Sequence, residues 1–393
     1  MPPYPHQAVP LATDSTDIAA RAVAAGVLAI DTEFVSERRY ETLLCLVQVS
    51  VPGPDVAETP TIEAFDPLER AELGPLAGAL ADPEVEVLMH AARQDVGLLR
   101  RELGTEITSL FDTQVAAGFL GLGGQVGYGD LVSRVLGVRP QPSEGFTRWD
   151  QRPLSEEQVA YARGDVEHLP AVGAELRTRL VDAGRLEWAL EECRPLEASS
   201  LERVEENVFR RLPGLDRMPG PARAIARELV SWREEAARAA DRPAKSMLAD
   251  HVLAELARRP PRAEKALENV RGLPEATRQR RGRELLAAID RGREAEPPPA
   301  GPQVPRPDGA DAPVLGLAQA LVRQRALENG VSAELVANQA DLSAVVAAVR
   351  AHEDEPDVRP LTGWRRELVG RELLDLIAGE GALRVGRDGV ERV

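Results

Sequence analysis

The sequence predicts an α/β domain, a mixed sheet with flanking helices, followed by two small all-α helical-bundle domains. In the first 200 of the 393 residues, short apolar strand patterns alternate with helical periodicity. From about residue 202 to residue 293 the pattern is helical throughout, and it is helical again over 314–380. Seven prolines in 296–313 separate the two helical parts, and such a composition is typical of a semi-rigid linker.

A chain of this length is too long for one typical hydrophobic core and suits two or three domains. We place them at 1–205, 206–295 and 314–393, with the proline-rich linker over 296–313.

The α/β domain is expected to begin with a helix. Thr16 or Asp17 can cap this helix and Gly26 ends it, and the apolar run 27–30 then predicts a strand. The elements expected after it are strands at 43–50, 62–65 and 85–89, helices around 69–81, 92–102 and 128–137, and turns at 52–54 and 121–124.

Carboxylates follow two of these strands. Asp31 and Glu33 end the run 27–30 and lie two residues apart, so their side chains share one face of the strand. Asp95 follows the strand at 85–89, near the junction with the next helix. Carboxylates beside a core repel each other and resist desolvation, so a fold keeps such a cluster when divalent cations neutralise it.

A later helix carries a tyrosine and a fourth carboxylate. A capping box from Ser155 to Gln158 opens this helix, and its pattern runs past Leu169. Tyr161 and Asp165 are four residues apart and therefore share a helix face. If these elements meet, four carboxylates and a phenol converge on one pocket.

Oxygen ligands of this kind suit Mg²⁺ or Mn²⁺. Two such ions about 3.5–4 Å apart stabilise the attacking and leaving oxygens of a phosphodiester during in-line displacement. Tyr161 is expected to orient the attacking water, because a free phenol with a pKa of about 10 is a poor base at neutral pH. Each motif alone has an ordinary explanation, such as a helix cap or a chance pair, but their order and contexts make the combination specific.

The sequence resembles the ribonuclease D family, which belongs to the 3′–5′ exonucleases with four acidic residues and a tyrosine. The blocks that carry the resemblance are Asp31 to Phe34 with 44–48, His90 to Asp95, and Tyr161 to Leu169, and 111–114 and 152–155 are similar to the flanking segments. The resemblance implies a ribonuclease-H-like fold and two divalent metal ions held by Asp31, Glu33, Asp95 and Asp165. In the loop that leads to Trp149, this chain has Pro-Gln-Pro-Ser at 140–143, where members of the family carry a basic residue.

The helical parts support the same family. Residues from Leu229 to Gly272 resemble the HRDC domain, a helical domain shared by RecQ-type helicases and ribonuclease D. Residues 363–374 resemble the ending of a second, divergent copy. The resemblance therefore covers nearly the whole chain.

Candidate substrate contacts come from both parts of the chain. In the first domain they are Phe34, Gln48 and His90, although His90 could instead be a buried histidine that supports the loop before Asp95. Asp112 could approach the metal pocket or cap a helix, and the cap is the safer interpretation.

In the helical part, a basic stretch that includes Arg278, Arg280 and Arg281 is the best candidate for phosphate contacts. An ordinary solvated helix face with interspersed glutamates is the alternative.

Net charge is −16, but its distribution is uneven. Residues 1–200 carry 32 acidic and 16 basic residues, whereas 201–293 carry 15 acidic and 21 basic residues. This asymmetry favours a metal-dependent catalytic domain beside a module that binds a polyanion, although an acidic surface can simply aid solubility. Aromatic residues make up only 4% of the chain, which argues against an extensive stacking platform for single strands.

We expect a cytoplasmic monomer. No stretch approaches the about 20 apolar residues of a membrane span, and no targeting pattern opens the chain. Cys45 and Cys193 have no metal-binding spacing and form no disulfide framework.

The residues predict a metal-dependent hydrolysis of phosphodiester bonds. The resemblance implies a 3′–5′ exoribonuclease that trims structured RNA, tRNA precursors above all, and releases nucleoside 5′-monophosphates. Two other functions stay open. One is a 3′–5′ exodeoxyribonuclease in DNA repair, because the catalytic set is shared with DNA-acting relatives. The other is a nucleic-acid-binding scaffold with a vestigial nuclease pocket, against which the complete acidic set argues.

Overall fold

A computed structural model describes residues 11–53, 59–140, 148–299, 309–387 and 389–393. The described residues form two compact units. The first contains those of Met1–Glu33, Leu44–Ser200 and Val304–Val393, and the second those of Phe34–Leu43 and Leu201–Gln303. Most of segment 140–143 and part of the predicted turn and linker lie outside the described residues.

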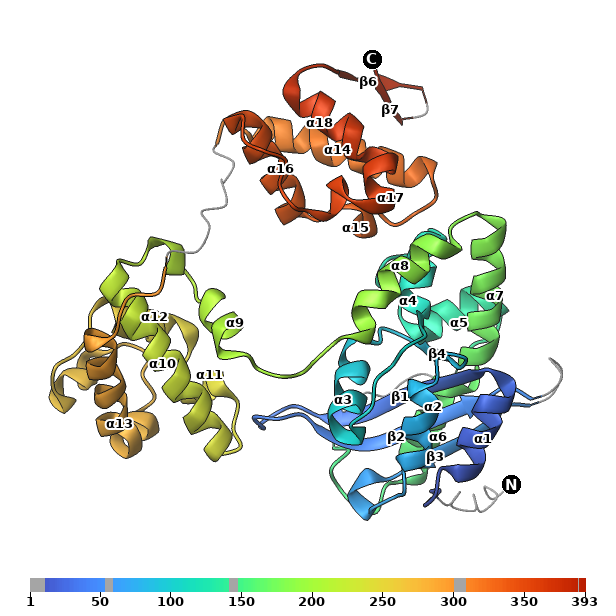
Figure 1. Cartoon of the computed structure of the whole chain (residues 1–393), viewed down its shortest axis with the longest axis horizontal. Coiled ribbons are helices and arrows are strands. Elements are labelled where there is room, and N and C mark those ends of the chain that lie inside the picture. The colour runs from blue at the N-terminus through green and yellow to red at the C-terminus, as the bar shows by residue number, and fades with distance from the viewer. Residues whose placement is uncertain (1–10, 54–58, 141–147, 300–308, 388) are drawn as a thin grey trace, which may run out of the picture. The chain divides into compact units, whose positions relative to one another are not determined.

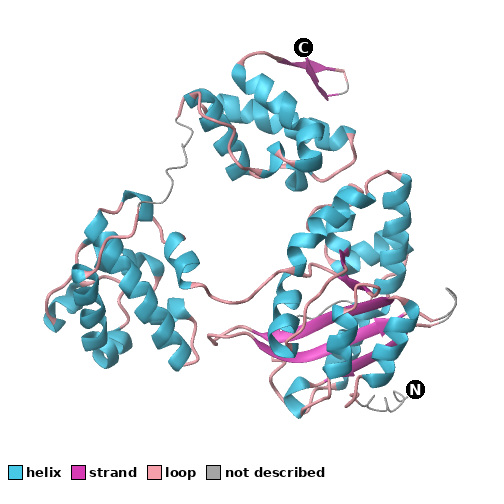
Figure 2. Ribbon diagram, viewed as in Figure 1, coloured by secondary structure: helices cyan, strands magenta, loops and turns pink. Residues whose placement is uncertain are grey.

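The sheet is mixed, as predicted. Its strands are β1 (Val27–Val35), β2 (Leu43–Val51), β3 (Thr61–Phe65), β4 (Glu86–Met89) and β5 (Leu110–Asp112), in the order β3-β2-β1-β4-β5. Strands β1, β4 and β5 run parallel, with Ala29 opposite Leu88 and Leu88 opposite Phe111, whereas β2 and β3 are antiparallel. Helices cover both faces of the sheet (Figures 1 and 2), which explains why β2 is buried along almost its whole length.

The helices of this α/β part are α1 (Thr16–Ala25), α2 (Gly74–Ala81), α3 (Arg93–Leu103), α4 (Thr113–Phe119), α5 (Tyr128–Leu136), α6 (Glu156–Glu167), α7 (Leu169–Asp182) and α8 (Leu186–Glu197). Gly26 ends α1 with φ of 67°, a left-handed conformation that glycine adopts without steric cost. The helix expected at 69–81 is shorter: a 3-10 turn at Pro67–Glu69 ends at Arg70, whose φ of 62° breaks the helix before α2.

The single helix expected to run past Leu169 is two helices. The capping box at Ser155 is present, but α6 ends at Glu167 and α7 starts at Leu169. Pro170 supplies the reason, because it has no N–H to donate to the carbonyl of Val166 and therefore cannot continue α6.

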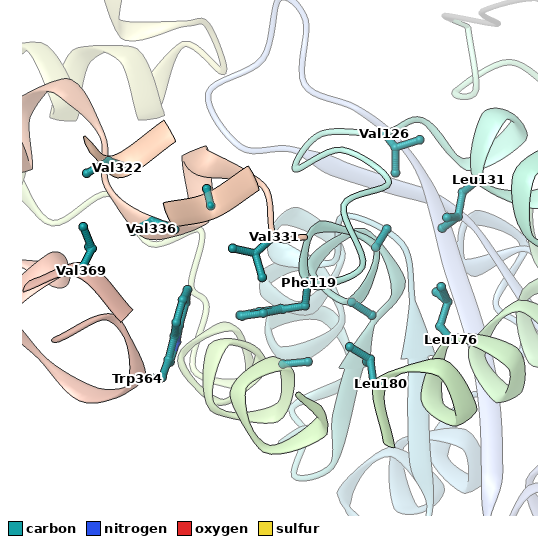
Figure 3. Close-up of a cluster of buried hydrophobic side chains, with 14 of the residues drawn as sticks. Phe119, Val126, Leu131, Leu176, Leu180, Val322, Val331, Val336, Trp364 and Val369 are labelled. Atoms are coloured by element: carbon teal, nitrogen blue, oxygen red, sulfur yellow. The ribbon is translucent and has the colours of Figure 1, made fainter. Parts of the chain in front are cut away.

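The C-terminal part of the first unit is helical, as predicted, and then ends in an unpredicted hairpin. Its elements are α14 (Ala312–Glu328), α15 (Ala333–Val336), α16 (Gln339–Ala351), a 3-10 turn (Arg359–Leu361), α17 (Gly363–Arg365), a π-helical turn (Arg366–Gly370), α18 (Arg371–Ala378), β6 (Leu383–Gly386) and β7 (Gly389–Arg392). This part packs against the α/β part through one apolar cluster, in which Phe119, Val331 and Trp364 lie side by side (Figure 3).

The second unit is helical apart from residues 34–43. Its elements are α9 (Glu205–Arg210), a 3-10 turn (Leu215–Arg217), α10 (Gly220–Ala239), α11 (Ala244–Met247), α12 (Asp250–Arg258), a 3-10 turn (Glu264–Asn269) and α13 (Glu275–Glu294). Trp232 lies in its core. Within this unit the hydroxyl of Tyr40 donates to the fully buried carboxylate of Glu234 at 3.2 Å.

The last long helices of the two helical parts share a five-residue pattern. Gly282-Arg283-Glu284-Leu285-Leu286 on α13 matches Gly370-Arg371-Glu372-Leu373-Leu374 at the start of α18. Gly282, Leu285, Gly370 and Leu373 are buried. The two parts therefore share a packing pattern, as two copies of one module would.

None of the helices in the described ranges combines the length and the apolar character that a bilayer crossing requires. Both cysteines are free and buried.

Candidate active site

Three of the four predicted carboxylates meet in one group. Asp31 and Glu33 extend from one face of β1, and Asp165 reaches them from α6. One carboxylate oxygen of each lies within 4.8 Å of the others. The strand and the helix thus bring together residues that are more than 130 positions apart in sequence.

Asp95 lies beside this group and not within it. It occupies the first turn of α3 and accepts a short hydrogen bond from the hydroxyl of Thr32, the residue between Asp31 and Glu33. Its charge nevertheless raises the pKa of both Asp31 and Glu33. Of the four carboxylates that were expected to converge, three therefore form a group, and the fourth is held against the strand that carries two of them.

Burial and mutual repulsion dominate the electrostatics. Burial, with the charges of Asp95, Asp165 and Glu33, raises the pKa of Asp31 well above its ordinary value. Burial also raises the pKa of Glu33 to about 8 and those of Asp95 and Asp165 to about 6.

Within the described part of the chain, no arginine or lysine forms an ion pair with any of these four carboxylates, although many other acidic residues are paired. A partly buried group of carboxylates that offers only oxygen atoms and has no positive partner fits hard divalent cations such as Mg²⁺ or Mn²⁺. The donor set contains no sulfur or nitrogen within the group, which disfavours zinc.

Tyr161 lies one helical turn before Asp165, as the spacing predicts. Burial, followed by the charges of Asp165 and Glu33, raises the pKa of Tyr161, so the phenol keeps its proton at neutral pH. The hydrogen bond that the phenol donates to Asp165 adds to this rise and lowers the pKa of the carboxyl. The ring of Trp149 packs beside it, with centroids 6.1 Å apart.

Gln48 lies on β2 and is fully buried. Its amide nitrogen donates to Oδ2 of Asp31 at 2.7 Å, so the side chain supports a carboxylate of the site. Phe34 follows Glu33 on β1 and is partly exposed, and strand alternation places it on the opposite face from Glu33. Contact of either residue with a nucleotide stays a prediction.

His90 supports the loop before α3, which is the alternative that the sequence left open. Its Nδ1 lies 3.0 Å from the hydroxyl of Thr113, and its Nε2 lies 3.0 Å from the carbonyl oxygen of Val126. Because that carbonyl can only accept, Nε2 carries a proton, and burial lowers the pKa of the ring so that it is neutral.

Asp112 is a cap, as the sequence favoured. Its carboxylate accepts from the backbone N–H groups of Gln114 and Val115 at the start of α4. It also accepts from the N–H groups of Ala91 and Ala92 in the turn that leads into α3.

The three arginines proposed for phosphate contacts differ in their surroundings. Arg278 pairs with Glu268 at 3.0 Å, and Arg281 pairs with Glu284 at 3.1 Å. Arg280 is exposed and has no ion pair among the described residues. Of the three arginines, Arg280 is therefore the one whose charge is not shared with a carboxylate of the described residues, and its contact with a phosphate stays a prediction.

Two contributions were missed by the sequence reasoning. Thr32 was included only as part of the block from Asp31 to Phe34, yet its buried hydroxyl donates a hydrogen bond to Asp95. Arg152 was quoted only as part of a flanking segment, yet it fixes the loop that carries Trp149. The position of Thr32, a polar residue between two carboxylates on a strand, is a sequence signal for its contribution. Nothing local in the sequence indicates the contacts of Arg152.

Comparisons with known proteins agree with this geometry. Residues 7–181 match the model of a 3′–5′ exonuclease family, and residues 222–289 match that of the HRDC domain. A ribonuclease D of Acidiphilium cryptum is 36% identical, over 98% of this chain and 97% of the relative. A ribonuclease D of Nitrobacter hamburgensis is 34% identical, over 93% of this chain and 94% of the relative.

A solved structure matches over almost the same extent. The crystal structure of Escherichia coli RNase D, described as an exoribonuclease involved in structured RNA processing, superposes with a TM-score of 0.79. It is 26% identical, and the match covers 95% of this chain and 99% of that chain. With its acidic site, its α/β fold and its helical parts, the chain belongs to the ribonuclease D family of 3′–5′ exonucleases.

Proposed function

We propose that this member of the ribonuclease D family is a metal-dependent exoribonuclease that shortens structured RNA from its 3′ end, with tRNA precursors among its substrates. The observation that carries the proposal is the partly buried group of Asp31, Glu33 and Asp165, which has no positive partner among the described residues. The relatives named ribonuclease D support RNA as the substrate.

Asp31, Glu33 and Asp165 would hold the metal ions, with Asp95 beside them. Two divalent ions, Mg²⁺ or Mn²⁺, would lower the pKa of water and neutralise the oxygens of the scissile phosphodiester. Thr32 and Gln48 would keep Asp95 and Asp31 in place through their hydrogen bonds. Such support fixes the direction of ligand oxygens.

Tyr161 would orient the attacking water. Because its phenol proton is donated to Asp165, the lone pairs of the phenol oxygen are available to accept a hydrogen bond from that water. Attack on phosphorus breaks the bond to the 3′ oxygen. The shortened RNA leaves with a 3′-hydroxyl, and the released nucleotide is a 5′-monophosphate.

The helical parts would hold the RNA backbone. The excess of basic residues in 201–293 and the exposed Arg280 favour contacts that do not depend on base sequence. The division into a nuclease domain (1–205), two HRDC-like domains (206–295 and 314–393) and a linker (296–313) remains part of the proposal, as do a monomeric state and a cytoplasmic location.

The test uses RNA labelled at its 5′ end, with a single-stranded 3′ tail, incubated with Mg²⁺, Mn²⁺ or EDTA. The wild type should give a ladder of 3′-shortened products and free nucleoside 5′-monophosphates only with metal. Asp31→Asn should lower kcat by about 10³-fold or more, because it removes a ligand of the site. Asp17→Asn, which changes an exposed carboxylate, is the matched control and should retain full activity.

A DNA strand of the same sequence runs alongside. Faster shortening of DNA than of RNA would contradict the RNA assignment and favour a repair exonuclease. RNA binding without cleavage of either strand in any metal would favour the scaffold.

A further inference from the structure

Arg152 uses all five of its guanidinium N–H groups inside the first unit. Its Nε and Nη2 bind the two carboxylate oxygens of Asp66, the Nη2 contact measuring 2.7 Å. Nη2 also donates to the carbonyl of Cys45 on β2 at 2.8 Å. Nη1 donates to the carbonyls of Trp149 and Gln151 at 2.7 and 2.8 Å.

Asp66, the carboxylate that Arg152 binds, is itself held in place. Asp66 is only 3% exposed and directly follows β3, and Oδ1 also accepts from the backbone N–H groups of Leu68 and Glu69. Because a planar guanidinium holds its donors in a rigid fork, Arg152 ties the loop before α6 to two strands of the sheet.

The side chain of Trp149 lies next to Tyr161. Trp149 is 2% exposed, and its ring forms a tilted pair with that of Tyr161, at 34° between planes. Tyr161 is only partly buried, so few side chains restrict its ring. Trp149 is one of the residues that pack against this ring and fix its orientation.

We propose that Arg152 and Trp149 are positioning residues for the reaction: the guanidinium holds the backbone of Trp149, and the indole holds the phenol of Tyr161 in the direction of the attacking water. The inference rests on the proposed role of Tyr161. A misplacement of about 1 Å in a group that orients a reactant can cost up to about 100-fold in rate.

The test is a double-mutant cycle in the full-length protein, with kcat and KM measured on the same labelled RNA. Arg152→Met should lower kcat by about 10-fold to 100-fold and leave KM within about twofold. In the Tyr161→Phe background, where no phenol hydroxyl remains to be placed, the same change should lower kcat by less than about threefold. The Mn²⁺ affinity of Arg152→Met, measured by calorimetry, should equal that of the wild type, because the guanidinium contacts none of the four carboxylates of the site.

A second pair of variants acts at the ring itself and leaves the Asp66 anchor intact. Trp149→Leu should reproduce the loss of kcat, whereas Trp149→Phe, which keeps an aromatic wall, should restore most of it. Arg325→Met removes another ion pair of the same unit, with Glu372 at 2.8 Å, and should leave kcat unchanged.

The outcomes separate two failures. If Tyr161→Phe retains the wild-type kcat, the role of Tyr161 fails and this inference fails with it. If Tyr161→Phe is impaired but Arg152→Met and Trp149→Leu are not, or if Arg152→Met costs as much in the Tyr161→Phe background, only the positioning role is overturned.

Discussion

The carboxylate of Glu33 lies where its protonated form is favoured. Burial and the charges of Asp165 and Asp95 raise its pKa to about 8. A group whose pKa is raised on folding binds its proton more tightly in the folded state than in the unfolded state. It therefore stabilises the fold at low pH, and this contribution is lost as the pH rises towards 8. Burial raises the pKa values of Asp95 and Asp165 to about 6, so their contributions to stability are lost at a lower pH than that of Glu33.

The metal-free protein should accordingly become less stable between pH 5.5 and pH 8.5. In EDTA we expect the unfolding temperature to fall over this range in the wild type and to fall less in Glu33→Gln, which has no carboxylate to ionise there. Mg²⁺ competes with protons for the ligands, so its stabilising effect should grow with pH. Thermal unfolding followed by circular dichroism measures both effects. Equal slopes for the wild type and Glu33→Gln would contradict the raised pKa.

At the scale of elements, the sequence predicted β2, β3, β4, α1, α3 and α5 to within a few residues, because each has a clear apolar period and a clear end. The strand expected over 27–30 is longer, because β1 continues through Asp31 and Glu33 to Val35. It missed β5, whose three residues are too few to show a period. It merged α6 and α7, because the break depends on Pro170 within an otherwise continuous helical pattern. The shared faces of Asp31 with Glu33 and of Tyr161 with Asp165 were predictable, because residue spacing sets the face of a strand or a helix. The Arg152–Asp66 contact was not, because it joins residues 86 positions apart and depends on the tertiary fold.

At the end of β5, the side chain of Asp112 stabilises the beginnings of two helices, α3 and α4. Asp112 caps α4 and also holds the turn before α3, the helix that carries Asp95 in its first turn. Asp112→Ala would leave four N–H groups without their acceptor in a buried place, and we expect a loss of about 2–4 kcal/mol in the free energy of unfolding.

Asp112→Asn is the matched control for that change, since it retains one acceptor oxygen and should cost less. Urea unfolding monitored by circular dichroism compares the three proteins. A loss below about 0.5 kcal/mol for Asp112→Ala would show that the turn finds other acceptors.

At the scale of the whole molecule, the C-terminal helices of the first unit pack against the α/β part that carries the acidic site. Trp364 stacks on Trp188 at 5.1 Å and packs edge-on against Phe119 of α4 at 5.0 Å. Arg365 binds both carboxylate oxygens of Glu192 on α8 at 2.6 Å, and its Nε donates to the carbonyl of Leu335. The residue after Glu192 on α8 is Cys193, whose Sγ accepts a hydrogen bond from the backbone N–H of Asp112. The same helix therefore contacts both Arg365 and the residue that holds the turn before α3.

The paired charges at this interface should be costly to separate. Arg365→Met leaves Glu192 partly buried without its partner, and we expect a loss of about 3–5 kcal/mol in the free energy of unfolding of the first unit. The double variant Arg365→Met, Glu192→Met removes both charges and should recover much of that loss, because two apolar side chains of similar length can share the space.

Arg366→Met supplies the control from the next residue. Arg366 pairs with Glu355 in a more exposed place, so its loss should cost at most about 1 kcal/mol. Thermal unfolding of the four proteins, with nuclease activity assayed before heating, separates the cases. Equal costs for Arg365→Met and Arg366→Met would mean that the Glu192 contact adds nothing beyond an ordinary surface pair. A larger cost for Arg365→Met that the second substitution reverses would establish the C-terminal helices as a structural part of the nuclease.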